Sequence, residues 1–179
     1  MNAVVVYESM YGNSRAVAEA VADALGAEAV AVHDAGDRPG NVDLLVVGGP
    51  THVHGLSTVR SRQMAVSAAD EDGAAMVEPH AAGLGLREWL RDLEHSDGAA
   101  AATFDTRLDR APWMTGVASR GIARRLRRRG YEVLASESFL VDDSEGPLEE
   151  GELERASAWG AELARLHEGQ ARKTAEARS

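Results

Sequence analysis

Residues 4–18 decide the fold of this chain; they read Val4-Val5-Val6-Tyr7-Glu8-Ser9-Met10-Tyr11-Gly12-Asn13-Ser14-Arg15-Ala16-Val17-Ala18. The β-branched run at the start predicts a buried strand, because a strand covered on both faces is apolar without alternation. Beyond the small and hydroxyl-bearing residues, apolar side chains recur at positions 16, 17, 20, 21, 24 and 25, which is typical of an amphipathic helix. The stretch is therefore predicted to form a strand, a tight loop and a helix.

The chemistry of this loop favours a phosphate ligand. A helix N-terminus presents unpaired backbone N–H groups and a partial positive charge, and Ser9, Asn13 and Ser14 add side-chain donors. The lysine of the nucleoside-triphosphate motif G-x-x-x-x-G-K-[ST] is missing, and Gly12 alone does not make the dinucleotide fingerprint G-x-G-x-x-G. We therefore expect a phosphate monoester held by hydrogen bonds. The alternative is an ordinary βα turn with an Asn or Ser cap.

At this loop the chain resembles the flavodoxin family. Flavodoxins bind the phosphate of FMN in a strand-end loop of the form S/T-x-T-G-N-T. The segment Ser9-Met10-Tyr11-Gly12-Asn13-Ser14 is similar to it, with Tyr11 where a threonine is usual. The resemblance implies that the six residues of this segment bind FMN.

A second glycine-bearing loop follows the next buried run, Leu44–Val47. Glycine allows the backbone to approach a ligand closely, and in flavodoxins the corresponding loop contacts the isoalloxazine ring, often through a tryptophan. The resemblance extends the predicted FMN contacts to Pro50, Thr51, His52, Val53, His54 and Gly55, with histidines in place of the tryptophan. A metal site formed by His52 and His54 is disfavoured, because no third ligand lies at a useful spacing.

A third loop is predicted over residues 105–113, after a weak strand. Flavodoxins commonly stack an aromatic side chain from this loop on the flavin. The resemblance adds the contacts Phe104, Asp105, Thr106, Arg107 and Trp113, with Trp113 as the stacking candidate. Arg107 would bring a permanent positive charge to the pyrimidine side of the ring. Alternatively, Arg107 points to solvent or pairs with Asp105 or Asp109.

The whole pattern predicts an α/β fold. Five strands alternate with helices, and right-handed crossovers then give a doubly wound five-stranded parallel sheet with helices on both faces. Strands are expected at 4–6, 27–33, 44–47, 99–104 and 131–141. The flavodoxin order, 2-1-3-4-5, places the switch point between strands 1 and 3, where the first two glycine loops leave the sheet. We expect a single flavodoxin-like domain over residues 1–168.

Three segments carry their own expectations. Residues 58–85 lack clear periodicity and are predicted to be an inserted loop or lid that folding does not require. Residues 117–130 form a helix with six arginines, which we interpret as a solvated face rather than a nucleic-acid site. Residues 169–179 contain no large apolar residue and are predicted to be disordered. No inserted segment interrupts the fifth strand, and in this respect the chain resembles the short-chain flavodoxins.

Composition narrows the classes of function. The 179 residues include no cysteine, which excludes disulfides, thiolate catalysis and iron–sulfur ligation. The net charge of −10 argues against a nucleic-acid partner. No apolar run reaches the ~18 residues of a membrane span, and the N-terminus enters a strand at once, so we expect a cytoplasmic protein without a membrane partner. We identify no side-chain nucleophile or acid–base pair.

The resemblance favours an FMN-dependent electron carrier that shuttles electrons between redox partner proteins, a reductase and an acceptor. An alternative is a flavodoxin-like NAD(P)H:quinone reductase or a related FMN-dependent oxidoreductase, because the segment after the second loop could build a substrate site. A third is a flavin-free module that binds a partner. The sequence leaves the oligomeric state open.

Overall fold

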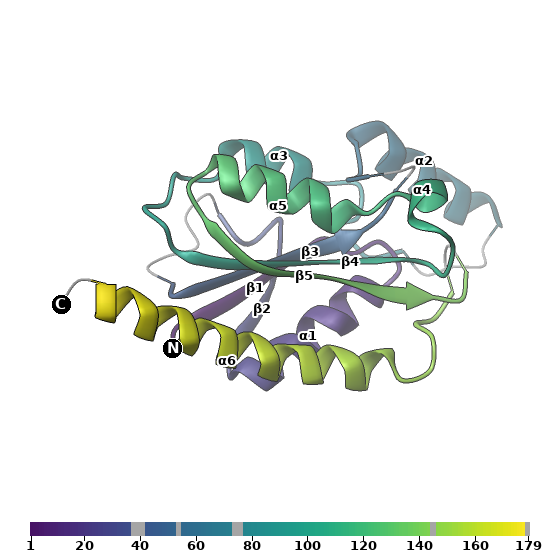
Figure 1. Ribbon diagram of the computed structural model, residues 1–179. Coiled ribbons are helices and arrows are strands. Elements are labelled where there is room, and N and C mark those ends of the chain that lie inside the picture. The colour runs from purple at the N-terminus through teal and green to yellow at the C-terminus, as the bar shows by residue number, and fades with distance from the viewer. Residues whose placement is uncertain (37–41, 53–54, 73–76, 144–145, 178–179) are drawn as a thin grey trace.

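A computed structural model of the chain describes residues 1–36, 42–52, 55–72, 77–143 and 146–177. Its centre is a parallel five-stranded sheet (Figure 1). The order β2-β1-β3-β4-β5 confirms the predicted topology. The strands are β1 Ala3–Tyr7, β2 Glu28–Ala31, β3 Leu44–Pro50, β4 Ala100–Leu108 and β5 Glu132–Val141.

Helices cover both faces of the sheet, as predicted (Figure 1). They are α1 Asn13–Leu25, α2 Val59–Asp72, α3 Leu86–Asp92, α4 Pro112–Thr115, α5 Ala118–Arg128 and α6 Glu152–Ala177. One face packs against α1 and α6, and the other against α3 and α5. None of the described helices is long and apolar enough to cross a membrane.

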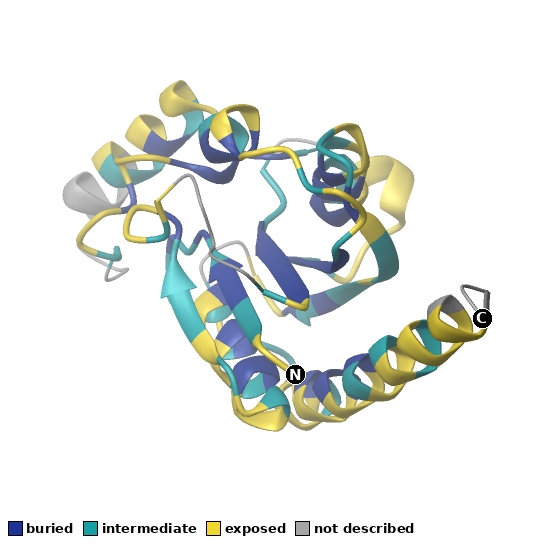
Figure 2. Ribbon diagram, turned by 90° about the vertical axis from the view of Figure 1, so that its left-hand side faces the viewer, coloured by how far each residue is buried: buried dark blue, intermediate teal, exposed yellow. Residues whose placement is uncertain are grey.

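Each face of the sheet has its own core. On the α1/α6 face the rings of Phe104, Phe139 and Trp159 meet edge to face, with centroids 6.0 to 6.5 Å apart. On the other face Trp89 is only 3% exposed and packs among apolar residues of α3 and α5, so it belongs to the core. The buried surfaces of the helices accordingly face the sheet (Figure 2).

Strands β3 and β4 extend beyond their predicted ends. β3 continues through Pro50, and β4 continues to Leu108, so residues 105–108 belong to a strand rather than to the expected loop. The reason is pairing with neighbours: Thr106 of β4 lies opposite Pro50 on one side and Phe139 on the other. The polar residues in this extension hid the strand from a prediction based on apolar runs.

The segment 58–85 contains a helix, α2, where the sequence indicated no regular element. Its Arg62 side chain is 1% exposed and fully enclosed by the domain. A helix anchored by a buried charge lacks the apolar stripe on which sequence-based assignment depends. The expectation that folding does not require the segment therefore conflicts with its packing.

The C-terminal helix is also longer than expected. α6 continues to Ala177, whereas disorder was predicted from residue 169. The residues beyond Glu168 include alanine, arginine, lysine and glutamate, all good helix formers. An Arg172–Glu168 pair at 3.9 Å adds an (i, i+4) contact. Low apolar content explains why this part is exposed, but it does not prevent the helix.

Candidate functional site

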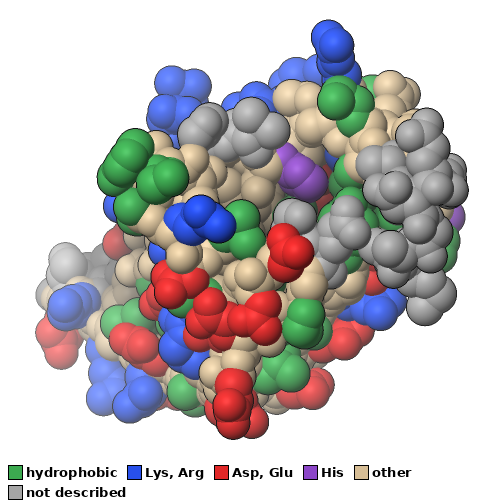
Figure 3. All heavy atoms as spheres, turned by 90° about the vertical axis from the view of Figure 1, so that its right-hand side faces the viewer, with side chains coloured by type: hydrophobic (Ala, Val, Ile, Leu, Met, Phe, Trp, Pro, Cys, Tyr) green, Lys and Arg blue, Asp and Glu red, His purple; other side chains and the backbone are tan. Residues whose placement is uncertain are grey.

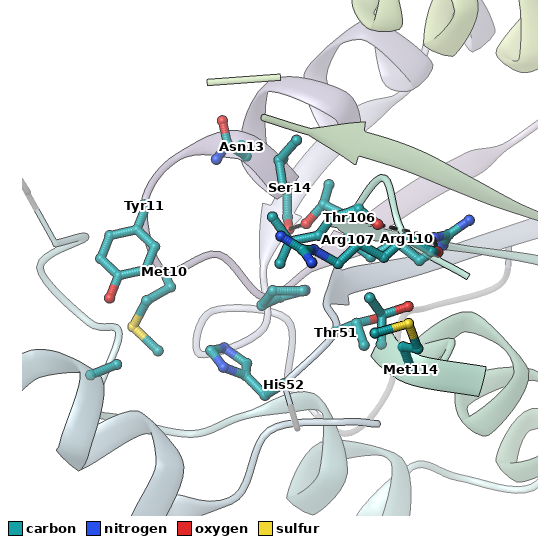
Figure 4. A pocket seen from close by; sticks show the side chains of 15 residues that line it. Met10, Tyr11, Asn13, Ser14, Thr51, His52, Thr106, Arg107, Arg110 and Met114 are labelled. Carbon is teal, nitrogen blue, oxygen red and sulfur yellow. Dashed lines mark hydrogen bonds between the residues drawn. The ribbon is translucent and has the colours of Figure 1, made fainter. Parts of the chain in front are cut away.

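A pocket of about 440 Å³ opens where β1, β3 and β4 end. This volume lies in the range of small-molecule sites, and the position matches the switch point of an α/β sheet. Figure 4 shows Met10 and Tyr11 on one side and Thr106, Arg107 and Arg110 on the other. The lining residues are Met10, Tyr11, Asn13, Ser14, Pro50, Thr51, His52, Ala65, Thr106, Arg107, Leu108, Arg110, Met114, Thr115 and Val141.

The loop after β1 is a tight turn that leads directly into α1. Gly12 caps the helix with a φ of 90°, a left-handed conformation that favours glycine. Its backbone N–H donates to the Ser9 hydroxyl oxygen at 3.1 Å, which closes the turn. The first N–H groups of a helix have no intrahelical acceptor, so α1 begins with donors beside a pocket that Asn13 and Ser14 line.

Hydrogen bonds join this loop to two later segments. The Ser14 and Thr106 hydroxyl oxygens are 2.7 Å apart, and both groups are buried. The Asn13 side-chain amide donates to the Gly146 carbonyl oxygen at 2.6 Å. The start of α1 is therefore fixed against the end of β4 and against Gly146 in the connection after β5, and the polar wall of the pocket is set before any ligand binds.

The buried carboxylate of Asp105 connects the second and third loops by hydrogen bonds. Its side chain is fully buried and accepts hydrogen bonds from the hydroxyls of Thr51 and Ser138 and from the backbone N–H of Ala118. The Ala118 N–H also lies 3.0 Å from the Thr51 hydroxyl oxygen. Asp105 thus holds Thr51 and the start of α5 in place, and it does not itself line the pocket.

A second buried network lies behind the first loop. Glu8 accepts hydrogen bonds from the Ser57 hydroxyl and from the backbone N–H of Leu86, at 2.7 Å in the second case. Arg62 donates to Ser57 at 2.9 Å and to the Glu88 carboxylate at 3.0 Å. Gly85 leaves the necessary room, because a Cβ there would overlap the Arg62 guanidinium. This network attaches α2 to the residue that follows β1.

Two pocket residues hold buried nitrogens that lack a protein partner within the described ranges. They are Nε2 of His52 and Nε of Arg107. A second guanidinium nitrogen of Arg107 is engaged, since Nη1 donates to the carbonyl oxygens of Leu108 and Arg110 at 3.0 and 2.8 Å. The alternative ion pairs of Arg107 with Asp105 or Asp109 do not occur. Unmatched buried polar atoms are costly, so these two favour a polar ligand in the pocket.

Burial lowers the pKa of His52; nearby Arg62 lowers it further and Glu8 opposes the shift. The folded protein therefore resists protonation of His52, whereas the imidazole of the unfolded chain takes up its proton at about pH 6.5.

We expect the contribution of His52 to the free energy of unfolding to be highest above that pH and to fall as the pH drops from there toward the folded-state pKa. Urea unfolding at about pH 7.5 and about pH 5.5 should show a smaller decrease in His52→Gln than in the wild type. Equal decreases would contradict a pKa difference between the folded and unfolded states.

Comparison with known proteins gives matches at the level of structure only. No model of a protein family and no curated protein sequence matches the chain. The flavodoxin of Streptococcus pneumoniae TIGR4 superposes with a TM-score of 0.61 at 19% identity, covering 92% of this chain and 99% of that one. A flavodoxin from the domain Archaea gives 0.57 at 18% identity, covering 94% and 99%. A WrbA-like flavodoxin from Agrobacterium tumefaciens gives 0.56 at 20% identity, covering 94% and 98%.

These superpositions cover nearly the whole of each chain with one topology. The protein has a flavodoxin-like fold. At sequence identities of 18 to 20%, the superpositions show the fold alone. The chemistry of the flavodoxin-like pocket therefore follows only from the residues that line it.

The flavodoxin-like fold gathers most of the predicted contacts, but not all of them. Nine predicted residues line the pocket, and they come from all three loops: Met10, Tyr11, Asn13, Ser14, Pro50, Thr51, His52, Thr106 and Arg107. Ser9, Gly12 and Gly55 lie in the loops without lining it. Val53 and His54 fall outside the described residues. Whether any of these residues contacts FMN stays a prediction.

Two aromatic residues that were predicted to contact the flavin, Phe104 and Trp113, lie away from the pocket. Phe104 is fully buried under the sheet, between Phe139 and Trp159. Trp113 belongs to α4, is 81% exposed and does not line the pocket. The cause in each case is local geometry. Phe104 points to the opposite face of β4 from its sequence neighbours, and Pro112 starts a short helix that carries Trp113 outward while Met114 lines the pocket.

Sequence reasoning missed six lining residues: Ala65, Leu108, Arg110, Met114, Thr115 and Val141. Ala65 comes from α2, which was not predicted. Leu108 ends β4, which was predicted to stop at Phe104, whereas Val141 ends β5 as predicted but was not assigned to the site. Pro112 is a signal for a helix start, and it could have indicated that residues 112–115 turn back toward the pocket.

Proposed function

We propose that this flavodoxin-like protein binds FMN and transfers electrons between redox partner proteins, a reductase and an acceptor, in the cytoplasm. The observation that carries the proposal is the combination found in one pocket. The N-terminus of α1, a site suited to a phosphate, opens into a pocket that His52 and Arg107 also line, and each of these side chains holds a buried nitrogen without a described protein partner.

The donors in the pocket fit the parts of FMN. Asn13 and Ser14 line the pocket at the helix N-terminus that would take the phosphate, and Ser9 and Gly12 form the turn that leads into it. Thr106, Arg107 and His52 offer hydroxyl, guanidinium and imidazole groups to the polar edge of a ring, while Met10 and Met114 supply apolar contact. Bound FMN supplies one- and two-electron transfer; the chain's own residues bind it, orient it and limit the access of water.

A second candidate function is an FMN-dependent oxidoreductase, such as an NAD(P)H:quinone reductase. It is favoured by one observation, a second cleft that borders the same pocket at His52. An electron carrier needs only an exposed ring edge, whereas an oxidoreductase also needs a place for its substrate.

The proposal is tested by comparing FMN with riboflavin. Flavin-free protein is titrated with each flavin, and binding is monitored by the quenching of flavin fluorescence. The affinity for FMN should exceed that for riboflavin on the order of a hundredfold. A few charge-assisted hydrogen bonds to the phosphate account for that difference. Gly12→Ala should reduce this preference by about tenfold or more, because it strains the left-handed turn at the phosphate end.

The matched control is Gly26→Ala at the other end of α1. Gly26 has a φ of 61°, and no atom lies within 4 Å of the position that an added methyl group would take, so the substitution strains the same helix without touching the pocket. It should lower stability but leave the FMN-to-riboflavin ratio unchanged. Equal binding of the two flavins by the wild type, or no binding of either, would refute the proposal.

A further inference from the structure

A second cleft of about 660 Å³ lies beside the cofactor pocket, between α2, α3 and α5. Arginines from all three helices line it: Arg60, Arg87, Arg120, Arg124 and Arg125. The sequence suggested only a basic helix with a solvated face. The structure instead brings side chains from separate elements around one concavity, which a simple solvated face would not require.

These arginines have no acidic partners in the described part of the chain. None of the five belongs to an ion pair with a described carboxylate, although acidic residues outnumber basic ones by 29 to 19. No described carboxylate lines the cleft. Viewed from the carboxyl ends of the strands, acidic side chains gather in the lower half of the molecule and several basic ones along its upper edge (Figure 3). The positive charge in the cleft is therefore not compensated by any carboxylate that the structure describes.

Two of the guanidinium groups are held in position by backbone carbonyls. Arg87 donates to the carbonyl oxygens of Ser57 and Leu56 at 2.9 and 2.6 Å, and Arg125 donates to that of Gly121 at 3.1 Å. Burial lowers the pKa of Arg125, and the positive charges of Arg87, Arg124 and Arg128 lower it further. Crowded like charges on fixed side chains raise the free energy of the empty cleft, and an anion would relieve that cost.

The start of α5 adds to the same potential. Val117, Arg120 and Gly121 line the cleft, so the positive end of the helix macrodipole lies at its edge. His52 lines both this cleft and the cofactor pocket. A ligand held by the arginines would therefore extend toward the place where FMN is proposed to bind.

We propose that this cleft binds a small ligand that carries a diphosphate, with Arg120 and Arg124 as its principal contacts. Guanidinium groups match phosphate oxygens in a bidentate geometry. Arg120 and Arg124 are one helical turn apart and both lie on the side of α5 that lines the cleft, so together they can span two adjacent phosphates. The site is formed by the chain alone and goes beyond the proposed function, because binding there does not require FMN.

The experiment is calorimetric titration of the protein with pyrophosphate, ADP and NADPH at constant ionic strength. The test variant is Arg120→Gln/Arg124→Gln. The control, Arg127→Gln/Arg128→Gln, removes the same charge from exposed positions further along α5 that do not line the cleft. The test variant should weaken pyrophosphate binding by about tenfold or more, and the control by about threefold or less.

The three probes distinguish the source of the diphosphate. Tighter binding of ADP than of NADPH indicates a nucleoside diphosphate, and the reverse order indicates a ligand with a further phosphate or nucleoside beside the diphosphate. Equal weakening by the two double variants would overturn the site, since it would show attraction to net charge alone. Failure of all three probes to bind would overturn it as well. FMN affinity, measured separately on the same variants, should not change.

Discussion

Arg62→Leu is expected to destabilise the protein by about 3–5 kcal/mol, the cost of breaking a buried ion pair by removing one partner. Leucine approximates the volume of the lost side chain's stem but removes the donor to the Ser57 hydroxyl and leaves the Glu88 carboxylate with only the backbone N–H of Gly85. Because the Arg62 side chain is 1% exposed and the Glu88 side chain 21%, water can replace those hydrogen bonds only in part. The free energy of unfolding from urea titration, monitored by circular dichroism, measures the effect.

Arg60→Leu is the matched control. Arg60 lies two positions earlier in the same helix but is exposed, so the same substitution should change stability by no more than about 0.5 kcal/mol. Adding Glu88→Gln to Arg62→Leu should recover part of the loss, because the carboxylate left without its partner is then removed. If Arg62→Leu and Arg60→Leu were equally stable, α2 would contribute nothing to the fold through this contact.

Gly48→Ala is expected to cost about 3 kcal/mol, the upper part of the usual range for overpacking a core. Gly48 of β3 lies directly opposite Phe104 of β4 in the parallel register. An added methyl group would overlap ring atoms of Phe104. That ring is fully buried against Phe139 and Trp159, so it has no free space into which to move. Thermal and urea unfolding both report the change.

Two further variants isolate the cause. Gly169→Ala places a methyl group where no atom lies within 4 Å, inside α6. It should stabilise the protein by up to about 1 kcal/mol, through helix propensity alone. The double variant Gly48→Ala/Phe104→Leu should be no less stable than Gly48→Ala, since the smaller side chain makes room for the methyl group. Simple addition of the two costs would contradict a steric conflict.

The sequence predicted those parts of the fold that apolar spacing encodes. The β1–α1 unit and the run at Leu44–Val47 carry dense apolar patterns, and from them the strand order followed. The end of β4 was hidden because Asp105 and Thr106 are polar. Their place in a strand is stabilised by hydrogen bonds to Thr51 and Ser138, residues that are distant in sequence.

The residues of the candidate site that follow strand ends could be predicted from the sequence. Those that depend on the buried charge of Arg62 could not. Strand ends placed Ser14, Thr51 and Thr106 near one another, because parallel strands finish at the same edge. Nothing local indicates that Arg62 is enclosed, since arginine is usually exposed. The wall that Ala65 contributes could not be predicted without α2, and the basic cleft depends on the same helix.

The bonds to Glu8 have a consequence for the kinetics of ligand entry. Ser57 and Leu86, the residues immediately before and after the segment 58–85, both donate to this one carboxylate. The two residues that flank the segment are therefore held at Glu8, the residue after β1. Within the segment, Arg62 donates a hydrogen bond to Ser57. Moving the start of α2 aside would break the buried bonds of Arg62, so this described part of the segment acts as a fixed wall and not as a gate. Association of a ligand should accordingly follow a single phase whose rate rises in proportion to ligand concentration, with no slower step of opening before it.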